Sequence, residues 1–190
     1  MTLNAYEPTI ERTLASREEI AATVARLADR IAADYAGKPL LLIGVLKGAL
    51  HVSVDLAREI SRRIDGPSEI RMEYICVSSY GNATRSSGEV RLLKDVDRET
   101  AGQNVLIIED IIDNGHTLAY LRDLFQRRNP ATLRSCVLFD KPYRRLVNVP
   151  VEYVGMTVPD EFVIGYGLDY QELYRNLPYL AQLKASAFSS

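Results

Sequence analysis

The residues with the clearest potential for chemistry are three carboxylates within five positions, Glu109, Asp110 and Asp113. They follow the apolar run 105–108, which is long enough for one buried strand. Carboxylates beside a buried strand end are costly to leave unpaired. We therefore expect them to face sugar hydroxyls or a metal ion. The alternative is a buried strand followed by a solvated acidic loop.

A short polar turn follows these acids and leads into a helical pattern. The turn consists of Asn114, Gly115, His116 and Thr117. Apolar residues then recur at spacings of three or four over residues 118–125, which predicts a helix. Because unpaired N–H groups at a helix start attract anions, the turn is a candidate phosphate site. His116 is equally well explained as a surface residue.

Composition favours one ordinary globular domain, with 190 residues, 47% apolar and 25% charged. A formal charge of −2 creates no field that would recruit nucleic acid or anionic membranes. Cys76 and Cys136 lie far apart in apolar runs, which favours core packing in a reducing compartment. The N-terminus has no signal-like apolar stretch, and the block Leu40 to Leu46 is too short to span a bilayer. We expect a cytoplasmic protein that binds neither nucleic acid nor membranes.

Two amphipathic helices are predicted in the first third of the chain. Ser16 and Glu19 have the spacing of a capping box, and the apolar face of the following helix runs from Ile20 to Ile31. A second helix is predicted after Gly48, with Leu56, Ile60 and Ile64 on its apolar side. Strands are predicted over residues 40–45, 70–77, 89–94, 105–108, 133–139 and 151–156.

Strands alternating with helices predict an α/β fold with a mostly parallel sheet covered on both faces. Ligands of such sheets bind beyond the carboxyl ends of the strands. Lys47, the acidic run and Lys141 each follow an apolar strand, so we expect them to share one site. Lys47 could neutralise an anion, and Gly48 would permit close backbone approach. Taken alone, this pair is more simply a surface lysine beside a turn glycine.

The predicted organisation is a single domain over residues 1–190. Its core spans about 38–157, and a hood, meaning the N-terminal segment together with residues 158–190, covers one end. A loop over 78–88 is rich in Ser, Gly, Asn, Thr and Arg and is expected to be flexible, joining two strands of a hairpin. A Walker A loop, a dinucleotide fingerprint, a zinc-ligand pattern and a serine-hydrolase elbow are all missing from the sequence.

Val105 to Leu118 resembles the phosphoribosyl-pyrophosphate (PRPP) motif of the type I phosphoribosyltransferases. Further segments are similar, in order, to the hypoxanthine-guanine members of that family. They are Leu46-Lys47-Gly48, Ser79-Tyr80-Gly81, Lys141, residues 158–166 and residues 168–175. The resemblance covers about Leu40 to Arg175. It implies Mg²⁺-dependent transfer of phosphoribose from PRPP to N9 of hypoxanthine or guanine, releasing pyrophosphate and forming IMP or GMP in purine salvage.

The resemblance also implies roles around PRPP. Pyrophosphate would lie against Lys47 and Gly48, at a turn where this family has a non-proline cis peptide, and would be reached by Arg175. Residues 114–117 would hold the 5′-phosphate, although the family has Ser or Thr where this chain has Asn114. Glu109 and Asp110 would both face the ribose hydroxyls and the ligands of one magnesium ion. Asp169 would lie near a second magnesium ion and the purine edge.

For the purine, the resemblance implies that Lys141 donates to the oxygen at C6 and that Phe162 stacks on the ring. The Val163 backbone would bind the base edge, and Asp113 would exchange a proton near N7. The loop around Ser79 and Tyr80 would close over the reacting centre.

Two other functions remain open, a xanthine-preferring transferase and a PRPP-binding regulator. The family resemblance and the 11 tyrosines also lead us to expect a homodimer or homotetramer.

Overall fold

The computed structural model describes residues 9–79 and 90–187. The loop predicted over residues 78–88, including Tyr80, lies outside the described residues except at its first two positions.

A six-stranded sheet forms the body of the described structure, in the order β4-β3-β2-β5-β6-β7. Its strands are β2 (Pro39–Leu46), β3 (Glu69–Ser79), β4 (Val90–Lys94), β5 (Asn104–Ile112), β6 (Thr132–Asp140) and β7 (Tyr153–Thr157). All neighbouring pairs are parallel except β3 and β4, which form an antiparallel hairpin. The predicted mostly parallel α/β sheet is confirmed.

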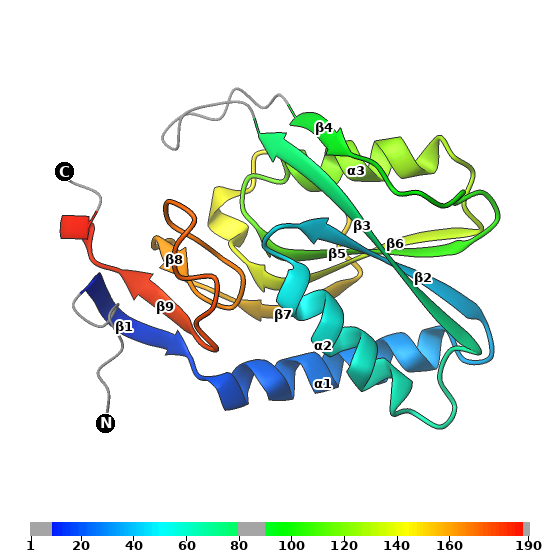
Figure 1. The fold of residues 1–190 in the computed structure, drawn as a ribbon, viewed down its shortest axis with the longest axis horizontal. Helices are drawn as coiled ribbons and strands as arrows, with labels where there is room; N and C mark the ends of the chain where they lie inside the picture. Colours follow the sequence, from blue (N-terminus) through cyan, green and yellow to red (C-terminus); the bar gives the residue numbers. More distant parts are fainter. Residues whose placement is uncertain (1–8, 80–89, 188–190) are drawn as a thin grey trace.

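Helices cover both faces of this sheet (Figure 1). α1 (Arg17–Asp34) and α2 (Leu50–Ser61) lie together on one face, and α3 (His116–Gln126) lies on the other. α1 begins at the predicted capping box, because Ser16 accepts from the Glu19 N–H and the Glu19 carboxylate accepts from the Ser16 N–H.

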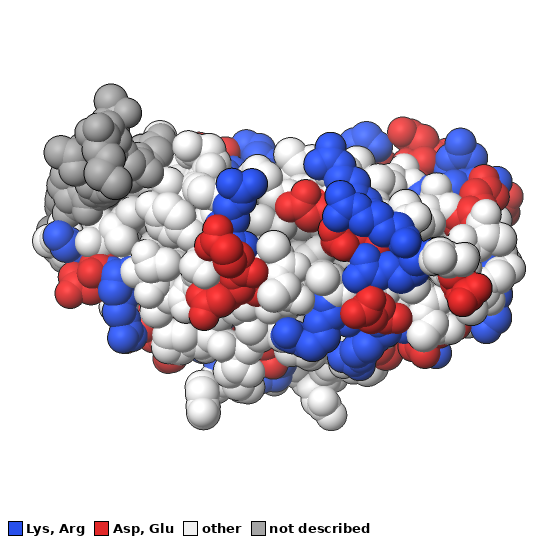
Figure 2. Space-filling view, turned by 90° about the horizontal axis from the view of Figure 1, so that it is seen from below, with Lys and Arg blue, Asp and Glu red and all other residues white. Residues whose placement is uncertain are grey.

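The predicted apolar face of α2 is right for Leu56 and Ile60, which are fully buried, but wrong for Ile64, which is 100% exposed. The helix ends at Ser61, so Ile64 lies beyond it in the following turn. Arg63, one residue earlier, joins the two helices through Asp29 at 2.8 Å and Glu59 at 2.7 Å. Figure 2 shows acidic and basic side chains interspersed over this side of the molecule.

A smaller antiparallel sheet forms the hood, in the order β1-β9-β8. Its strands are β1 (Ile10–Ala15), β8 (Val163–Ile164) and β9 (Leu180–Leu183). The hood therefore combines both ends of the described chain, and Figure 1 shows it facing the carboxyl ends of the large sheet. Its own apolar cluster consists of Ile164, Tyr174, Leu177, Ala181 and Leu183.

β5 is the central strand of the core, and its residues 105–108 are fully buried. The strand continues to Ile112, four residues past the predicted apolar run. Glu109 and Asp110 therefore lie within the strand and not in a loop after it, so their side chains point to opposite faces of the sheet. In the described ranges, no helix is both long and apolar enough to cross a membrane.

Candidate active site

The candidate site lies where the strand order reverses. β2 pairs with β3 on one side and with β5 on the other, although β3 and β5 follow it in sequence. β6 pairs with β5 along its whole length, ending at Ile112 opposite Asp140. A crevice forms beyond strand ends at such a reversal, and it is the usual ligand position in open α/β sheets.

The turn after β2 is packed between the sheet and the hood. It begins with a cis peptide between Leu46 and Lys47, as the family resemblance implied. A methyl group added at Gly48 would lie 1.7 Å from Asp110 Oδ2, and one added at Gly167 would lie 2.0 Å from the Gly48 carbonyl oxygen. A side chain at Gly167 would collide with backbone, so glycine is required there, whereas a side chain at Gly48 would displace the Asp110 carboxylate. Gly48 matches the sequence prediction, whereas Gly167 was not singled out.

Lys47 lies in a cluster of charged side chains with the 169–175 segment of the hood. Its Nζ is 2.7 Å from Glu172 Oε2, and the other oxygen of Glu172 is 3.2 Å from Arg175 Nη2. Arg175 Nη2 also lies 2.7 Å from Asp169 Oδ1. The structure thus brings the predicted residues Lys47, Asp169 and Arg175 together. Glu172, which connects them, was missed because a surface acid in an aperiodic segment has no sequence signal.

The acidic pair on β5 sits in a low-dielectric position. Glu109 is 5% exposed, and burial together with the neighbouring Asp110 raises its pKa to about 8. Burial raises the pKa of Asp110 to about 6, while Arg175 opposes and Asp169 adds to that rise. Asp110 is therefore influenced by residues of the Lys47 cluster. Glu109, which points to the other face of the sheet, is influenced by Arg145.

A cation would stabilise a buried carboxylate with a raised pKa, and Asp110, which lies near Asp169, is the better placed of the two for a divalent metal ion. Within residues 9–79 and 90–187, no group of three or more potential metal ligands occurs. Magnesium is often held by one or two carboxylates together with substrate phosphates and water. These residues are therefore better suited to an ion that binds together with a phosphorylated ligand than to an ion held by protein ligands alone.

A second set of predicted residues meets at the ends of β5 and β6. Lys141 is 5% exposed and donates to the Glu161 carbonyl at 2.5 Å. Burial lowers the pKa of Lys141 below its usual value, although the nearby carboxylate of Asp113 partly opposes this effect. Asp113 Oδ2 lies 3.4 Å from Arg144, whereas its buried Oδ1 accepts no hydrogen bond within the described part of the chain. A buried carboxylate oxygen without a donor is costly unless a ligand supplies one.

Phe162, the residue predicted to stack on the base, follows Glu161, whose carbonyl accepts the hydrogen bond from Lys141. Phe162 is 39% exposed and packs edge-on against Tyr170, with ring centroids 5.5 Å apart. Val163 is buried in β8, where it pairs with Gln182. An exposed ring beside a buried ammonium and a carboxylate suits a planar, polar heterocycle.

The predicted phosphate turn forms the N-terminal end of α3. Gly115 has φ +90°, a conformation open mainly to glycine, and precedes the first helical residue, His116. Asn114 Oδ1 accepts the His116 N–H at 3.0 Å, and the Asn114 carbonyl accepts from Leu146 and Val147. Thr117, in the first turn of α3, is partly exposed. The helix therefore begins two residues earlier than the apolar pattern predicted, and the Asn114 side chain takes one of its N–H groups.

Two arginines beside this turn were not singled out from the sequence. Arg145 pairs with Asp140 and donates to the Asp113 carbonyl at 2.9 Å, while Arg144 pairs with Asp160 as well as Asp113. They lie three and four residues after Lys141, at the end of a short 3₁₀ turn, where no sequence period indicates which side chains point inward. Ser79 ends β3, and Tyr80 lies outside the described residues.

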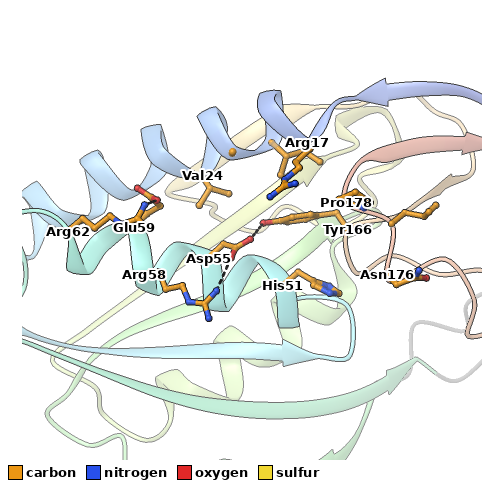
Figure 3. A pocket seen from close by; sticks show the side chains of 13 residues that line it. Arg17, Val24, His51, Asp55, Arg58, Glu59, Arg62, Tyr166, Asn176 and Pro178 are labelled. Carbon is orange, nitrogen blue, oxygen red and sulfur yellow. Dashed lines mark hydrogen bonds and ion pairs between the residues drawn. The ribbon is translucent and has the colours of Figure 1, made fainter. Parts of the chain in front are cut away.

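A separate cavity of about 440 Å³ lies between α1, α2 and the hood (Figure 3). Tyr166 reaches into it and donates its hydroxyl to Asp55 at 2.7 Å, with the His51 ring 5.9 Å away. None of the residues predicted for the site lines this cavity. The Tyr166–Asp55 bond instead ties the hood to α2.

Comparison with known proteins agrees with this arrangement. Residues 12–171 match the family model described as phosphoribosyl transferase domain. The chain therefore belongs to the phosphoribosyltransferases, a family of glycosyltransferases.

Its relatives narrow the family further. The chain is 45% identical over 183 residues to the hypoxanthine-guanine phosphoribosyltransferase of Streptococcus thermophilus, covering 96% of this chain and 98% of that protein. The Bacillus subtilis protein of the same name is 46% identical over 181 residues, covering 95% and 97%. A crystal structure of a Staphylococcus aureus hypoxanthine phosphoribosyltransferase matches with a TM-score of 0.91 at 38% identity, covering 100% of both chains. Within the family, the chain belongs with the hypoxanthine-guanine phosphoribosyltransferases.

Proposed function

We propose that this enzyme transfers the 5-phosphoribosyl group of PRPP to N9 of hypoxanthine or guanine, forming IMP or GMP and pyrophosphate in purine salvage. The observation that carries the choice of base is the buried Lys141 ammonium beside the unpartnered Asp113 oxygen. A 6-oxopurine presents an acceptor at C6 and a proton-exchanging nitrogen at N7, and the two groups complement it. Adenine presents a donor at C6, where Lys141 needs an acceptor.

The turn after β2 and the hood would hold the leaving group. Lys47 and Arg175 place two positive charges at this end of the site, and pyrophosphate gathers negative charge as its bond to the ribose breaks. Gly48, held between Asp110 and Gly167, keeps that turn in place. Positioning of this kind is a large part of catalysis in group transfer.

Residues 114–117 would bind the 5′-phosphate at the start of α3, where the helix dipole and the N–H groups of the first turn favour an anion. Glu109 and Asp110 would face the ribose hydroxyls, and their carboxylates tolerate the positive charge that develops at C1 of the sugar. Asp169 lies close enough to Asp110 to affect its pKa.

Glu109, Asp110 and Asp169 are the residues that would hold Mg²⁺. When bound with PRPP, the ion supplies charge neutralisation for the pyrophosphate oxygens.

At the base, Phe162 would stack on the purine, and the backbone of Val163 would bind its edge. Asp113 would take up or deliver the N7 proton, which commonly accelerates a reaction about 10²–10⁴-fold. Xanthine differs from guanine and hypoxanthine at C2, near that backbone, and a preference for xanthine is the nearest alternative. A PRPP-binding regulator is the other, and it would bind PRPP without turnover.

Purified protein mixed with PRPP, Mg²⁺ and one base at a time tests the proposal. We expect nucleotide and pyrophosphate to form with hypoxanthine or guanine, more slowly with xanthine, and not with adenine. PRPP binding without product from any base would favour the regulator and contradict the proposal. Omission of Mg²⁺ from the same assay tests the metal requirement.

We further propose a cytoplasmic location and a homodimeric or homotetrameric assembly. The location is supported by Cys76 and Cys136, which are both free and suit a reducing compartment. The assembly is supported by the family resemblance and by the 11 tyrosines of the chain. Light scattering of the purified protein measures the subunit number directly.

A further inference from the structure

Glu172 occupies the position that the proposed pyrophosphate site reserves for an anion. One of its oxygens is 2.7 Å from Lys47 Nζ, and the other is 3.2 Å from Arg175 Nη2. Both cations proposed to bind pyrophosphate therefore pair with the same carboxylate of the protein, and Arg175 pairs in addition with Asp169 at 2.7 Å. These hydrogen bonds lower the pKa of Glu172, with that from Lys47 contributing most.

The backbone around Glu172 is built to present this carboxylate. Glu172 has φ +65°, an uncommon conformation for a non-glycine residue, and its N–H donates to Asp169 Oδ2 at 2.9 Å. Tyr170 and Leu173 close the turn through two backbone hydrogen bonds of 3.3 and 3.0 Å. The turn therefore fixes the backbone of Glu172, and the Glu172 side chain extends to Lys47 in the turn after β2.

The contact is also easily exchanged. The Lys47 side chain is 64% exposed and that of Glu172 is 62% exposed, so solvent screens their attraction. Pyrophosphate carries several negative charges and more acceptor oxygens than one carboxylate, and it would compete well for both cations. Arg175 keeps its hydrogen bond to the Gly167 carbonyl at 2.7 Å, so its guanidinium stays oriented when Glu172 leaves.

We propose that Glu172 is a positioning residue of the pyrophosphate subsite, a carboxylate that holds Lys47 and Arg175 in the free enzyme and is displaced by the pyrophosphate group. This inference rests on the proposed function. Its consequence is that Glu172 weakens the binding of PRPP and of pyrophosphate and so favours product release. A residue with only a structural role in the turn would instead strengthen binding.

Glu172→Gln tests this inference, because the amide keeps the length and hydrogen-bonding capacity of the side chain and removes its charge. Titration calorimetry with inorganic pyrophosphate and Mg²⁺ measures the affinity without turnover. We expect the Kd for pyrophosphate to fall about 3- to 10-fold, as loss of one or two screened ion pairs predicts. The KM for PRPP should fall in parallel, while the KM for hypoxanthine stays the same.

Two further variants control the measurement. Glu172→Asp retains the charge but shortens the side chain by one methylene, so its Kd should lie between those of the wild type and Glu172→Gln. Glu69→Gln removes a carboxylate from an exposed pair with Arg71 at the amino end of β3, away from the site, and should leave the Kd unchanged. The gain in Glu172→Gln should also shrink as salt rises, since added ions screen the charges.

An unchanged or higher Kd for pyrophosphate in Glu172→Gln would overturn the inference, provided that the wild type turns over PRPP with hypoxanthine or guanine. Absence of wild-type turnover would overturn the proposed function instead. The turnover assay on the wild type thus tests the proposed function, and the pyrophosphate titration of Glu172→Gln tests the inference.

Discussion

Replacement of Gly167 by alanine tests whether contact between hood and sheet sets the geometry of the Lys47 turn. Gly167 has φ +103°, and a Cβ there would lie 2.0 Å from the Gly48 carbonyl oxygen. Ordinary contact begins near 3.4 Å, so the two segments would have to separate by more than 1 Å. Gly48 also packs closely on the Asp110 carboxylate, so a shift of this turn would disturb that acid as well.

Gly167→Ala is expected to affect both catalysis and stability. A displacement of about 1 Å at a catalytic group commonly reduces the rate about 10²-fold. We therefore expect kcat/KM for PRPP to fall about 100-fold in Gly167→Ala, with pyrophosphate affinity falling as well. The unfavourable backbone conformation adds about 1–3 kcal/mol of destabilisation.

Gly37→Ala separates the backbone effect from the collision. Gly37 also has a positive φ, +68°, but nothing lies within 4 Å of a Cβ built there. This variant should lose about 1–2 kcal/mol of stability, lowering Tm by about 2–8 °C, and should keep its activity. Steady-state kinetics and thermal unfolding of both variants are the measurements. A folded Gly167→Ala enzyme with wild-type kcat/KM would refute the view that this contact positions the turn.

Asp113→Asn should fold and bind PRPP but lose about 10²–10⁴-fold in kcat; an unchanged kcat would remove Asp113 from proton transfer. Lys141→Met should lower kcat/KM for hypoxanthine about 10- to 100-fold, as loss of a charged hydrogen bond predicts, and should narrow the preference over adenine; equal loss for both bases would contradict its role at C6. Asp95 tests pH dependence: hydrogen bonds from Arg128 at 2.6 and 3.0 Å hold its pKa below the usual range. Its contribution, about 1 kcal/mol after screening, should therefore be complete above the unfolded pKa of about 3.9 and lost as pH falls through the folded value. The Tm difference between wild type and Asp95→Asn should close at low pH, and a difference independent of pH would contradict this.

The large sheet was predictable because buried parallel strands are nearly continuous apolar runs. Residues 40–45 and 133–139 lie within β2 and β6 as predicted. The extent of β5 was underestimated because Glu109 and Asp110 interrupt its apolar run, and a charged residue normally signals the end of a buried strand. Glu109 and Asp110 break that rule, and residues that break it at a strand end are candidates for function.

The hood was harder to predict because its strands are short and come from opposite ends of the chain. β8 has two residues, and β1 joins β9 across nearly the whole length of the described chain. Residues 165–175 are irregular, with positive φ at Tyr166, Glu172 and Tyr174, and such a segment has no period. Glu172 and Gly167 act through contacts with the Lys47 turn, more than 100 residues away in sequence. Only the folded chain brings them together.

The spacing of the three acids sets the length of the candidate site. Asp110 belongs to the pyrophosphate end, since it adjoins Gly48 and responds to Arg175. Asp113 belongs to the base end, since it adjoins Arg144 and its carboxylate influences the pKa of Lys141. A strand rises about 3.3 Å per residue, so three residues separate the two ends by up to about 10 Å. The ribose must lie between its two substituents, pyrophosphate and purine. The end of β5 therefore places Asp110 near the pyrophosphate and Asp113 near the purine.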